Sequence, residues 1–505
     1  MDALQTLINA RALEIERIPL VALDDFQDGI QRLVGRGGRV SALFGAWPGA
    51  GEGVELFAVL ADDPASRLVL LRTLVRGDWF PALTPRVPQV HLFEREIAEQ
   101  FGLEARGHPW PKPVRFQPRL PRPGQSAAPG ESTTIGDVDY YAVEGESVHE
   151  VAVGPVHAGV IEPGHFRFQC HGEEVFHLEI SLGYQHRGVE RALIGGPDRR
   201  TMHYVETAAG DTTIGHALAH CLVVEALAEC KKSARAQTLR AVALELERLA
   251  NHVGDLGALA GDVGFQPTAS FCGRLRGEFL NMTAALCGSR FGRGLVRPGG
   301  VRFDVGGELL ADLLERLETA SRETREAVQL LWVTPAVMAR FEDTGALPRD
   351  VALELGMVGP AARASGIARD VRRDQPFGLF RFSQLPLGTW DSGDVLARAL
   401  VRWQETQRSV EFVRTELGQL PVGPVRLGHG PIAPSRLAVA MVEGWRGEIC
   451  HAALTDEEGR FARYKIVDPS FHNWSGLAHA LRGQQVSDFP LCNKSFNLSY
   501  CGHDL

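Results

Sequence analysis

Short apolar runs and polar breaks alternate along the first hundred or so residues of the chain. Val40–Phe44, Val54–Leu60 and Leu68–Leu74 are each of strand length and are separated by Gly- and Pro-rich segments. Runs of this length, with helical stretches between them, predict a small α+β domain over residues 1–115. Residues 116–135 are rich in Pro, Gly and Ser. Because Pro removes a backbone donor and disfavours helix before it, this segment is predicted to be a linker.

The hydrophobic pattern changes after this linker. Residues 138–179 indicate strands and turns, whereas long helical segments begin near Ile214. One of these segments has apolar residues three or four positions apart, which places them on one face of a helix. They are Leu239, Val242, Leu246, Leu249, Val253 and Leu256. Residues 136–505 are therefore predicted to form a helical bundle with a β-rich entrance, and the whole chain is predicted to be of the α+β class.

Composition and charge exclude several classes of protein. The 505 residues include 53 basic and 62 acidic side chains, for a formal net charge of −9, and 44% of the residues are hydrophobic. These values are typical of a globular protein and not of a disordered, collagen-like or disulfide-stapled chain. The chain also lacks the basic surplus that binding to nucleic acid requires.

The sequence also lacks the features of membrane insertion and of secretion. No run approaches the ~18 apolar residues of a membrane span, and the N-terminal segment has no hydrophobic core of the kind that a signal peptide has. The eight cysteines are scattered, and no two of them are spaced as C-x-x-C. This pattern favours a reducing, cytoplasmic compartment.

Several longer motifs carry a resemblance to known families. HLFEREIAEQFGLEARGHP (residues 91–109) resembles the 30-kDa-type subunit of respiratory complex I. Three later motifs resemble the 49-kDa-type subunit of complex I, which shares its fold with the large subunit of nickel–iron hydrogenases. They are GPVHAGVIEPGHFRF (154–168), LELERLANHVGDLGAL (244–259) and YKIVDPSFHNW (464–474). Both types in one chain, together with the EPGHFRF motif, are most similar to the large subunit of group 4 hydrogenases of the formate-hydrogenlyase type.

The resemblance implies a nickel–iron centre, which is soft and is held by four thiolates from two C-x-x-C motifs. Alignment of the segment before the long helices assigns the first pair of ligands to Ala209 and Thr212. The second pair falls on Ser499 and Gly502, in the C-terminal sequence SFNLSYCGHDL. None of the four residues has a thiolate, and neutral hydroxyls are poor ligands for nickel. The sequence therefore predicts no nickel site. In lacking these ligands, the chain resembles the complex I subunit and not the hydrogenase.

In complex I the vacated cavity is the end of a quinone channel, where a loop histidine and a tyrosine are the implied quinone partners. Here the tyrosine position falls on Gly210, and the loop reads EPGHF in hydrogenase style. Asp262 matches the helix acid that pairs with the loop histidine, and Glu162 matches a glutamate that group 4 enzymes are thought to use for proton transfer. Glu162, His157 and Asp262 are therefore the predicted catalytic residues. A structural alternative is that Glu162 caps a turn before Pro163.

Further residues are candidates for lining this cavity and contacting a cofactor, namely His165, His216 and Arg363. Each has a structural alternative, because a loop histidine is often a hydrogen-bonding strut and a buried arginine often bridges helices. His216 and His220 lie four positions apart on a predicted helix, so they share a face and either bind a metal or pack. A displaced metal site is a further hypothesis, formed by Cys492, Cys501 and His503.

The resemblance also implies a larger assembly. It predicts a small iron–sulfur partner of the complex I 20-kDa type, membrane antiporter-like subunits, and a peripheral position on the cytoplasmic face of the inner (plasma) membrane. The iron–sulfur cluster belongs to the partner, because the cysteines of this chain make no cluster pattern. The predicted function is to couple electron transfer, with quinone as a candidate acceptor, to proton movement without nickel. The alternatives are a non-catalytic scaffold subunit and an active group 4 hydrogenase with unusual ligands.

Overall fold

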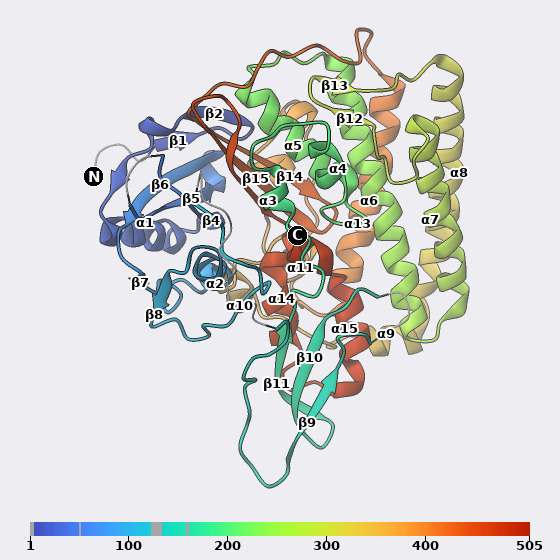
Figure 1. Ribbon diagram of the computed structural model, residues 1–505. Helices are drawn as coiled ribbons and strands as arrows, with labels where there is room; N and C mark the ends of the chain where they lie inside the picture. Colours follow the sequence, from blue (N-terminus) through green and yellow to red (C-terminus); the bar gives the residue numbers. More distant parts are fainter. Residues whose placement is uncertain (1–4, 50–51, 123–133, 158–160) are drawn as a thin grey trace.

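The computed structural model of the protein describes residues 5–49, 52–122, 134–157 and 161–505 (Figure 1). Its N-terminal part is a mixed sheet in the order β1-β6-β5-β4, with the short β3 parallel to β6. The elements are β1 (Gln5–Leu7), β2 (Arg11–Glu14), β3 (Leu20–Val21), α1 (Leu23–Gly35), β4 (Arg39–Ala46), β5 (Val54–Asp62), β6 (Arg67–Val75), β7 (Trp79–Pro81), α2 (His91–Phe101) and β8 (Glu104–Arg106).

The three apolar runs of this part form the strands β4, β5 and β6, as their length predicts. All three pair antiparallel, with Phe44 opposite Phe57 and Ala58 opposite Leu71. Every residue of β4 is buried, because α2 packs on it and β15 and β16 of the C-terminal half also approach it. A fully buried strand reads as a continuous apolar run and not as an alternating one.

A second sheet joins the two ends of the chain. It consists of β2 from the N-terminal part and β14 (Arg436–Gly444), β15 (Gly447–Thr455) and β16 (Phe461–Val467), all antiparallel in the order β16-β15-β14-β2. Leu13 of β2 lies opposite Leu437 of β14. The predicted linker, residues 116–135, falls largely on residues 123–133, which lie outside the described residues. The domain boundary placed there stays a prediction, and the shared sheet is an addition that the sequence did not indicate.

A three-stranded antiparallel sheet forms the predicted β-rich entrance and extends away from the rest of the molecule in Figure 1. It contains β9 (Val148–Val153), β10 (His165–His171) and β11 (Glu174–Ser181), with β10 in the centre. The loop between β9 and β10 carries Glu162 and His157, so the strands hold both ends of the segment that the sequence singles out.

Long helices make up most of the C-terminal half. They are α5 (Thr213–Leu227), α6 (Ala234–Asp262), α7 (Gln266–Cys287), α8 (Gly307–Trp332) and α13 (Val395–Gly418). Helices α6, α7, α8 and α13 lie side by side in Figure 1, and α5 packs on β14 and β15. The six apolar residues of the predicted stripe lie on α6 and are all buried. Charged residues of α6 such as Glu245 and Arg248 are buried as well, which shows that the helix is enclosed on most of its sides.

Shorter elements complete this half. They are α3 (Val189–Leu193), α4 (Thr201–Glu206), β12 (Val296–Arg297), β13 (Gly300–Val301), α9 (Pro335–Phe341), α10 (Arg349–Glu354), α11 (Gly359–Ala364), α12 (Val371–Asp374), η4 (Gly378–Arg381), α14 (Pro469–Ala480), α15 (Phe489–Phe496) and α16 (Tyr500–Asp504). Further 3-10 turns are η1 (Ile15–Arg17), η2 (Asp63–Ala65), η3 (Pro88–Val90) and η5 (Val486–Asp488). The mixture of helices and sheets confirms the α+β class. None of the helices in the described ranges combines the length and the apolar character that a membrane crossing needs.

Candidate functional site

Two segments far apart in the sequence meet at the candidate site. The first is the turn between α4 and α5, which contains Ala209 and Thr212, and the second is helix α16 at the C-terminus. Arg187 joins them, because its Nη2 donates to the carbonyl oxygens of Ala208 at 2.8 Å and Cys501 at 3.0 Å. The fold thus brings together the two segments to which the sequence assigns the lost ligand pairs.

At the first pair of positions, the hydroxyl of Thr212 is held by protein donors. Trp445 donates its indole N–H to Thr212 Oγ1 at 3.1 Å, and Arg446 Nη1 lies 3.3 Å from the same oxygen. Arg446 also forms an ion pair with Asp211 at 2.6 Å. Although burial alone would raise the pKa of the Asp211 carboxyl, the Arg446 guanidinium lowers it. Asp211 is therefore an anion that is already neutralised.

At the second pair of positions, Gly502 faces Asp468 and Ser499 precedes helix α16. The Ser499 hydroxyl accepts the Gly502 N–H at 2.9 Å, so it caps the first turn of α16. A Cβ added to Gly502 would lie 2.7 Å from Cγ of Asp468, closer than real contacts allow. Asp468 cannot withdraw freely, because it accepts from Ser470 N at 2.8 Å and contacts His216 Nε2 at 3.1 Å.

The loop between β9 and β10 contacts α16 through two of the predicted residues. The N–H of Cys501 points to Glu162 Oε2 at 3.5 Å, and Nε2 of His157 lies 3.4 Å from the Tyr500 hydroxyl. Burial, with a further contribution from Glu162, raises the pKa of the Cys501 thiol to about 12. Glu162 and His157 are half-buried, so they lie between this buried helix end and solvent.

The remaining predicted residues of this region lie elsewhere. His165 is buried, and its Nδ1 contacts the carbonyl oxygen of Gly154 at 3.4 Å, which is the contact of a loop strut. Asp262 lies at the end of α6, where the residue is exposed to solvent. Neighbouring groups still desolvate its carboxyl in part, which raises its pKa to about 6. Neither a hydrogen bond nor an ion pair joins Asp262 to Glu162 or His157 within the described residues.

His216 and His220 belong to a buried chain of polar side chains behind the site. His216 Nδ1 lies 3.1 Å from His451 Nε2, and Nδ1 of His451 lies 3.0 Å from the Tyr464 hydroxyl. The same hydroxyl lies 2.8 Å from His220 Nδ1. The two imidazoles of α5 are therefore bridged through the sheet. Burial lowers the pKa of His220 to about 4.

The residues of the hypothetical displaced metal site have separate partners. Cys492 lies beside Arg398, Cys501 contacts the Ser499 hydroxyl at 3.4 Å, and His503 pairs with Asp504. Over residues 5–49, 52–122, 134–157 and 161–505, no group of three or more His, Cys, Asp or Glu side chains is arranged to hold a metal ion.

Three residues of α6 border the site, although the sequence analysis did not select them. Glu247 accepts the N–H groups of Ile214 and Gly215 at 2.6 and 3.1 Å, which tethers the start of α5. Burial raises the pKa of Glu247 to about 8 despite these donors. Asn251 donates to the Asp211 carbonyl oxygen at 3.0 Å, and Asp255 accepts from Arg402 at 2.8 Å. Their spacing of four residues on one helix was the available signal.

Arg363 is placed in a different buried cluster, which we call the arginine network: Arg248, Arg363 and Arg372 with Glu245, Asp370, Glu405 and Glu443. The Arg363 guanidinium contacts Glu405 at 2.7 Å and Glu443 at 2.8 Å. Burial alone would lower the pKa of Arg363. The carboxylates outweigh this effect, so the pKa of Arg363 lies above its usual range. This geometry is that of the helix-bridging alternative.

Comparison with known proteins shows that the chain belongs to the family formed by the complex I 49-kDa subunit and related hydrogenase subunits. The family described as the 49-kDa subunit of respiratory-chain NADH dehydrogenase matches residues 262–437 and 427–504.

Relatives come from both branches of this family. The chain is 30% identical to formate hydrogenlyase subunit 5 of Escherichia coli over 83% of this chain and 76% of the relative. It is also 30% identical to the carbon monoxide-induced hydrogenase of Rhodospirillum rubrum, over 70% of this chain and 98% of the relative. NADH-quinone oxidoreductase subunit 4 of Thermus thermophilus is 30% identical over 66% of this chain and 89% of the relative.

Proposed function

We propose that this chain is a subunit of a membrane-associated oxidoreductase complex that couples electron transfer to proton movement without nickel. The relatives support an assembly of this kind, since their names include a formate hydrogenlyase subunit, NADH-quinone oxidoreductase subunits and a membrane-bound hydrogenase subunit of Pyrococcus furiosus. The motif at residues 91–109 supports a fused 30-kDa-type domain. In this proposal a small iron–sulfur partner delivers electrons, and antiporter-like membrane subunits receive the effect at the cytoplasmic face of the inner membrane.

The donor set at the four ligand positions supports the absence of nickel. Ala209 and Gly502 offer no side-chain donor, and the hydroxyls of Thr212 and Ser499 already hydrogen-bond to protein groups. A soft nickel–iron centre requires thiolates. These residues do not fit such a centre, so no step of the proposed chemistry passes through one.

The contact between Glu162 and α16 is the observation on which the proposal rests. A half-buried carboxylate touches the helix end that carries Ser499 and Gly502, while His157 touches the next residue, Tyr500. Groups that lie between solvent and a buried polar region can pass protons when they are within hydrogen-bonding reach. Behind them, Asp468 and His216 form a buried acid–imidazole pair at 3.1 Å. In this proposal Glu162 exchanges protons with solvent. His157, in contact with the Tyr500 hydroxyl, is the second group that passes protons at this helix end.

Quinone is the candidate electron acceptor of this proposal. Its reduction consumes two electrons and two protons for each molecule, so the acceptor site needs titratable groups at its edge. Glu162 and His157 are acid–base side chains at the edge of the candidate site, where they contact α16. Asp262 stays a weaker candidate, because it is exposed and is not joined to either of them by a hydrogen bond or an ion pair in the described part of the chain.

The test is the Glu162→Gln variant in the purified native complex, with reduced viologen as donor and a short-chain quinone analogue as acceptor. Gln keeps the shape and an acceptor for the Cys501 N–H but removes the titrating proton. Turnover should fall by about 10²-fold, the usual contribution of a proton-transferring side chain. Glu173→Gln, an exposed carboxylate at the turn before β11, is the matched control and should leave turnover unchanged.

A non-catalytic scaffold is the second candidate, and it is favoured by one observation. The hydroxyls of Thr212 and Ser499 are committed to structural hydrogen bonds, which is expected if the site now only supports the fold. A scaffold predicts that Glu162→Gln leaves both assembly and turnover unchanged. That result would contradict the coupling proposal directly.

A further inference from the structure

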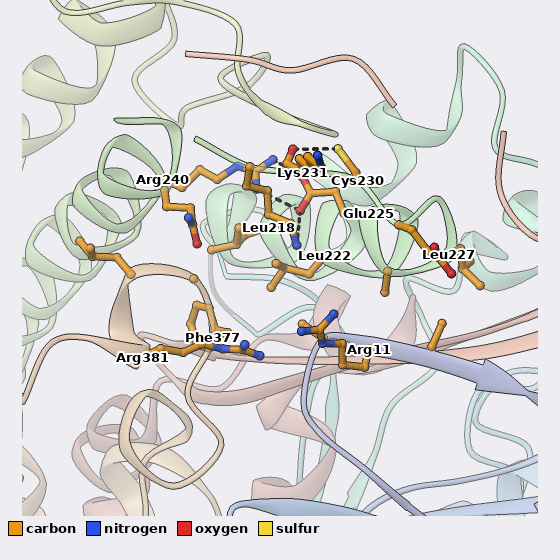
Figure 2. Close-up of a pocket in the computed structure, with 18 of the residues that line it drawn as sticks. Arg11, Leu218, Leu222, Glu225, Leu227, Cys230, Lys231, Arg240, Phe377 and Arg381 are labelled. Atoms are coloured by element: carbon orange, nitrogen blue, oxygen red, sulfur yellow. Dashed lines mark hydrogen bonds and ion pairs between the residues drawn. The ribbon is translucent and has the colours of Figure 1, made fainter. Parts of the chain in front are cut away.

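The structure contains a large cavity away from the residues of the candidate site. Its volume is about 550 Å³, which is within the usual range for small-molecule sites, roughly 300–1,000 Å³. The walls come from β2, the second half of α5, the connection to α6, the turn η4 and the start of β14. Figure 2 shows the side chains of α5 and α6 on one side, facing Arg11, Phe377 and Arg381 on the other.

Positive charge dominates the lining of this cavity. Six basic side chains contribute to it, whereas its acids are Glu225 and Glu229. Glu225 is already neutralised, because it pairs with Arg240 at 2.5 Å and with Lys232 at 3.3 Å. A cation surplus therefore remains, and a cavity with low-dielectric walls concentrates its field.

Two of the remaining cations face each other without a carboxylate between them. Arg381 donates only to backbone carbonyl oxygens, of Pro376 at 3.2 Å and Asn9 at 3.1 Å. Arg11 makes neither an ion pair nor a side-chain hydrogen bond within the described residues. Burial and the neighbouring charge of Arg11 lower the pKa of Arg381, so each guanidinium would gain from an anion between them.

Most of the remaining lining is apolar and partly aromatic. Leu218 and Leu222 project from α5, and Phe377 stands opposite them in Figure 2. Phe382, at the mouth, exposes 83% of its surface, although large apolar side chains are usually covered. Arginine guanidinium groups without a carboxylate partner match phosphate oxygens, whereas a flat or apolar group suits walls of this kind.

From this geometry we propose that the cavity between η4 and α5 binds a small organic phosphate whose remaining part is aromatic or apolar. Arg11 and Arg381 bind the phosphate, and the leucine and phenylalanine side chains cover the rest of the ligand. The site is independent of the proposed coupling function, since it shares no residue with the loop at Glu162.

Two probes distinguish the sources of such a ligand, and both are titrated into the purified native complex by calorimetry. ADP represents a soluble nucleotide, and monomeric dihexanoyl-phosphatidylglycerol represents a lipid. Either one should bind at least tenfold more tightly than inorganic phosphate, which cannot use the apolar wall. Failure of both probes to bind at about 1 mM, or inorganic phosphate binding as tightly as they do, would overturn the proposal.

Variants connect the binding to the cavity. Arg11→Gln and Arg381→Gln should each weaken binding of the successful probe by about tenfold or more, the usual effect of losing a charged hydrogen bond. Phe382→Ser should weaken it about fivefold, because a stacking surface is lost. Arg199→Gln, an exposed arginine outside the cavity, is the matched control. Affinity that is unaffected by both cavity arginine variants would contradict the assignment.

A footprint gives a second readout without any substitution. Cys230 lines the cavity and is half-exposed, whereas Cys287, also half-exposed, lies at the end of α7 outside it. The bound probe, at twice its Kd, should slow alkylation of Cys230 by maleimide about threefold. Cys287 should react at its original rate. Equal protection of both cysteines, or of neither, would contradict binding at this cavity.

Discussion

Two faces of the same helix, α6, carry buried polar residues that belong to two different regions of the molecule. Glu245, Arg248 and His252 lie on one face and belong to, or contact, the arginine network. Glu247, Asn251 and Asp255 lie on the other face and border the candidate site. The comparison is direct, because both sets are spaced three or four residues apart on one helix and all six residues are buried.

The arginine network is closed. Its three arginines face four carboxyl groups, and burial raises the pKa of Glu443 to about 7. His252 adds a contact of 2.9 Å to Glu405. Charges that satisfy one another in this way, without access to solvent, are structural. Burial of a charge is therefore a poor guide to function unless the group can also exchange protons or ligands.

The candidate site is open on the side of the loop between β9 and β10. Its groups are hydroxyls, a thiol and the half-buried Glu162 and His157, which contact α16. Both contacts, at 3.5 and 3.4 Å, are longer than the 2.7 and 2.8 Å at which Arg363 meets Glu405 and Glu443. Unlike the carboxylates of the arginine network, Glu162 is only half-buried and is paired with no arginine or lysine in the described part of the chain. The two regions therefore differ in that the charges of the arginine network pair with one another, whereas the candidate site has groups that solvent can reach. Substitutions can test this difference.

The largest effect is expected from Arg363→Met in the arginine network. The variant removes the cation that lies between Glu405, Glu443 and Asp370, so buried carboxylates lose their partner. We expect the free energy of unfolding to fall by about 3–5 kcal/mol, measured by denaturant titration of the full chain. Arg373→Met, an exposed arginine with one neighbouring carboxylate, should change it by less than about 1 kcal/mol. Equal effects would show that the network is not closed.

A smaller loss of stability is expected from Gly502→Ala at the candidate site. The new Cβ would meet the Asp468 carboxylate, which His216 and Ser470 hold in place. The expected cost is about 1–3 kcal/mol in the same titration. Gly273→Ala in α7, where a Cβ meets nothing within 4 Å, should be neutral or stabilising by up to about 1 kcal/mol. A neutral Gly502→Ala would show that this position has room for a ligand side chain.

The stability of the folded chain should depend on pH through the buried carboxyl of Glu247. Since the folded pKa of about 8 is above the usual 4.5, the folded chain holds an extra proton between these values. This contribution to stability is complete below about pH 4.5 and is lost as pH rises through 8. Glu247→Gln imitates the protonated carboxyl, so its unfolding free energy should decrease less between pH 5 and 8, by about 1.4 kcal/mol per unit of pKa shift. Exposed Glu315→Gln should keep the wild-type profile, and an identical profile for Glu247→Gln would contradict the assignment.

The sequence predicts much of the fold, because the relevant patterns are local. The apolar runs of β4, β5 and β6 and the stripe on α6 depend on periodicity along one element. The sheet shared by β2 and β14 depends on contacts between residues more than 400 positions apart, such as Leu13 and Leu437, and no local pattern encodes them. The α+β class follows from the sequence, whereas this long-range pairing does not.

The candidate site could be predicted only in part for the same reason. The four ligand positions stay an assignment by resemblance, and the fold brings the two segments that carry them together through Arg187. Asp468 and Glu247 were not selected, because their proximity to α16 and α5 depends on long-range contacts. The four-residue spacing of Glu247 and Asn251 marks a shared helix face but not what that face contacts. Asp262 was selected by its place in a resemblance, yet it lies exposed at a helix end.

The central claim is that the site between α5 and α16 operates without nickel. The most direct measurement is the nickel and iron content of the purified native complex, per copy of this chain, by inductively coupled plasma mass spectrometry. The account predicts less than about 0.1 nickel per chain, with all iron belonging to partner clusters. About one nickel per chain would contradict it and would favour a hydrogenase with substitute ligands.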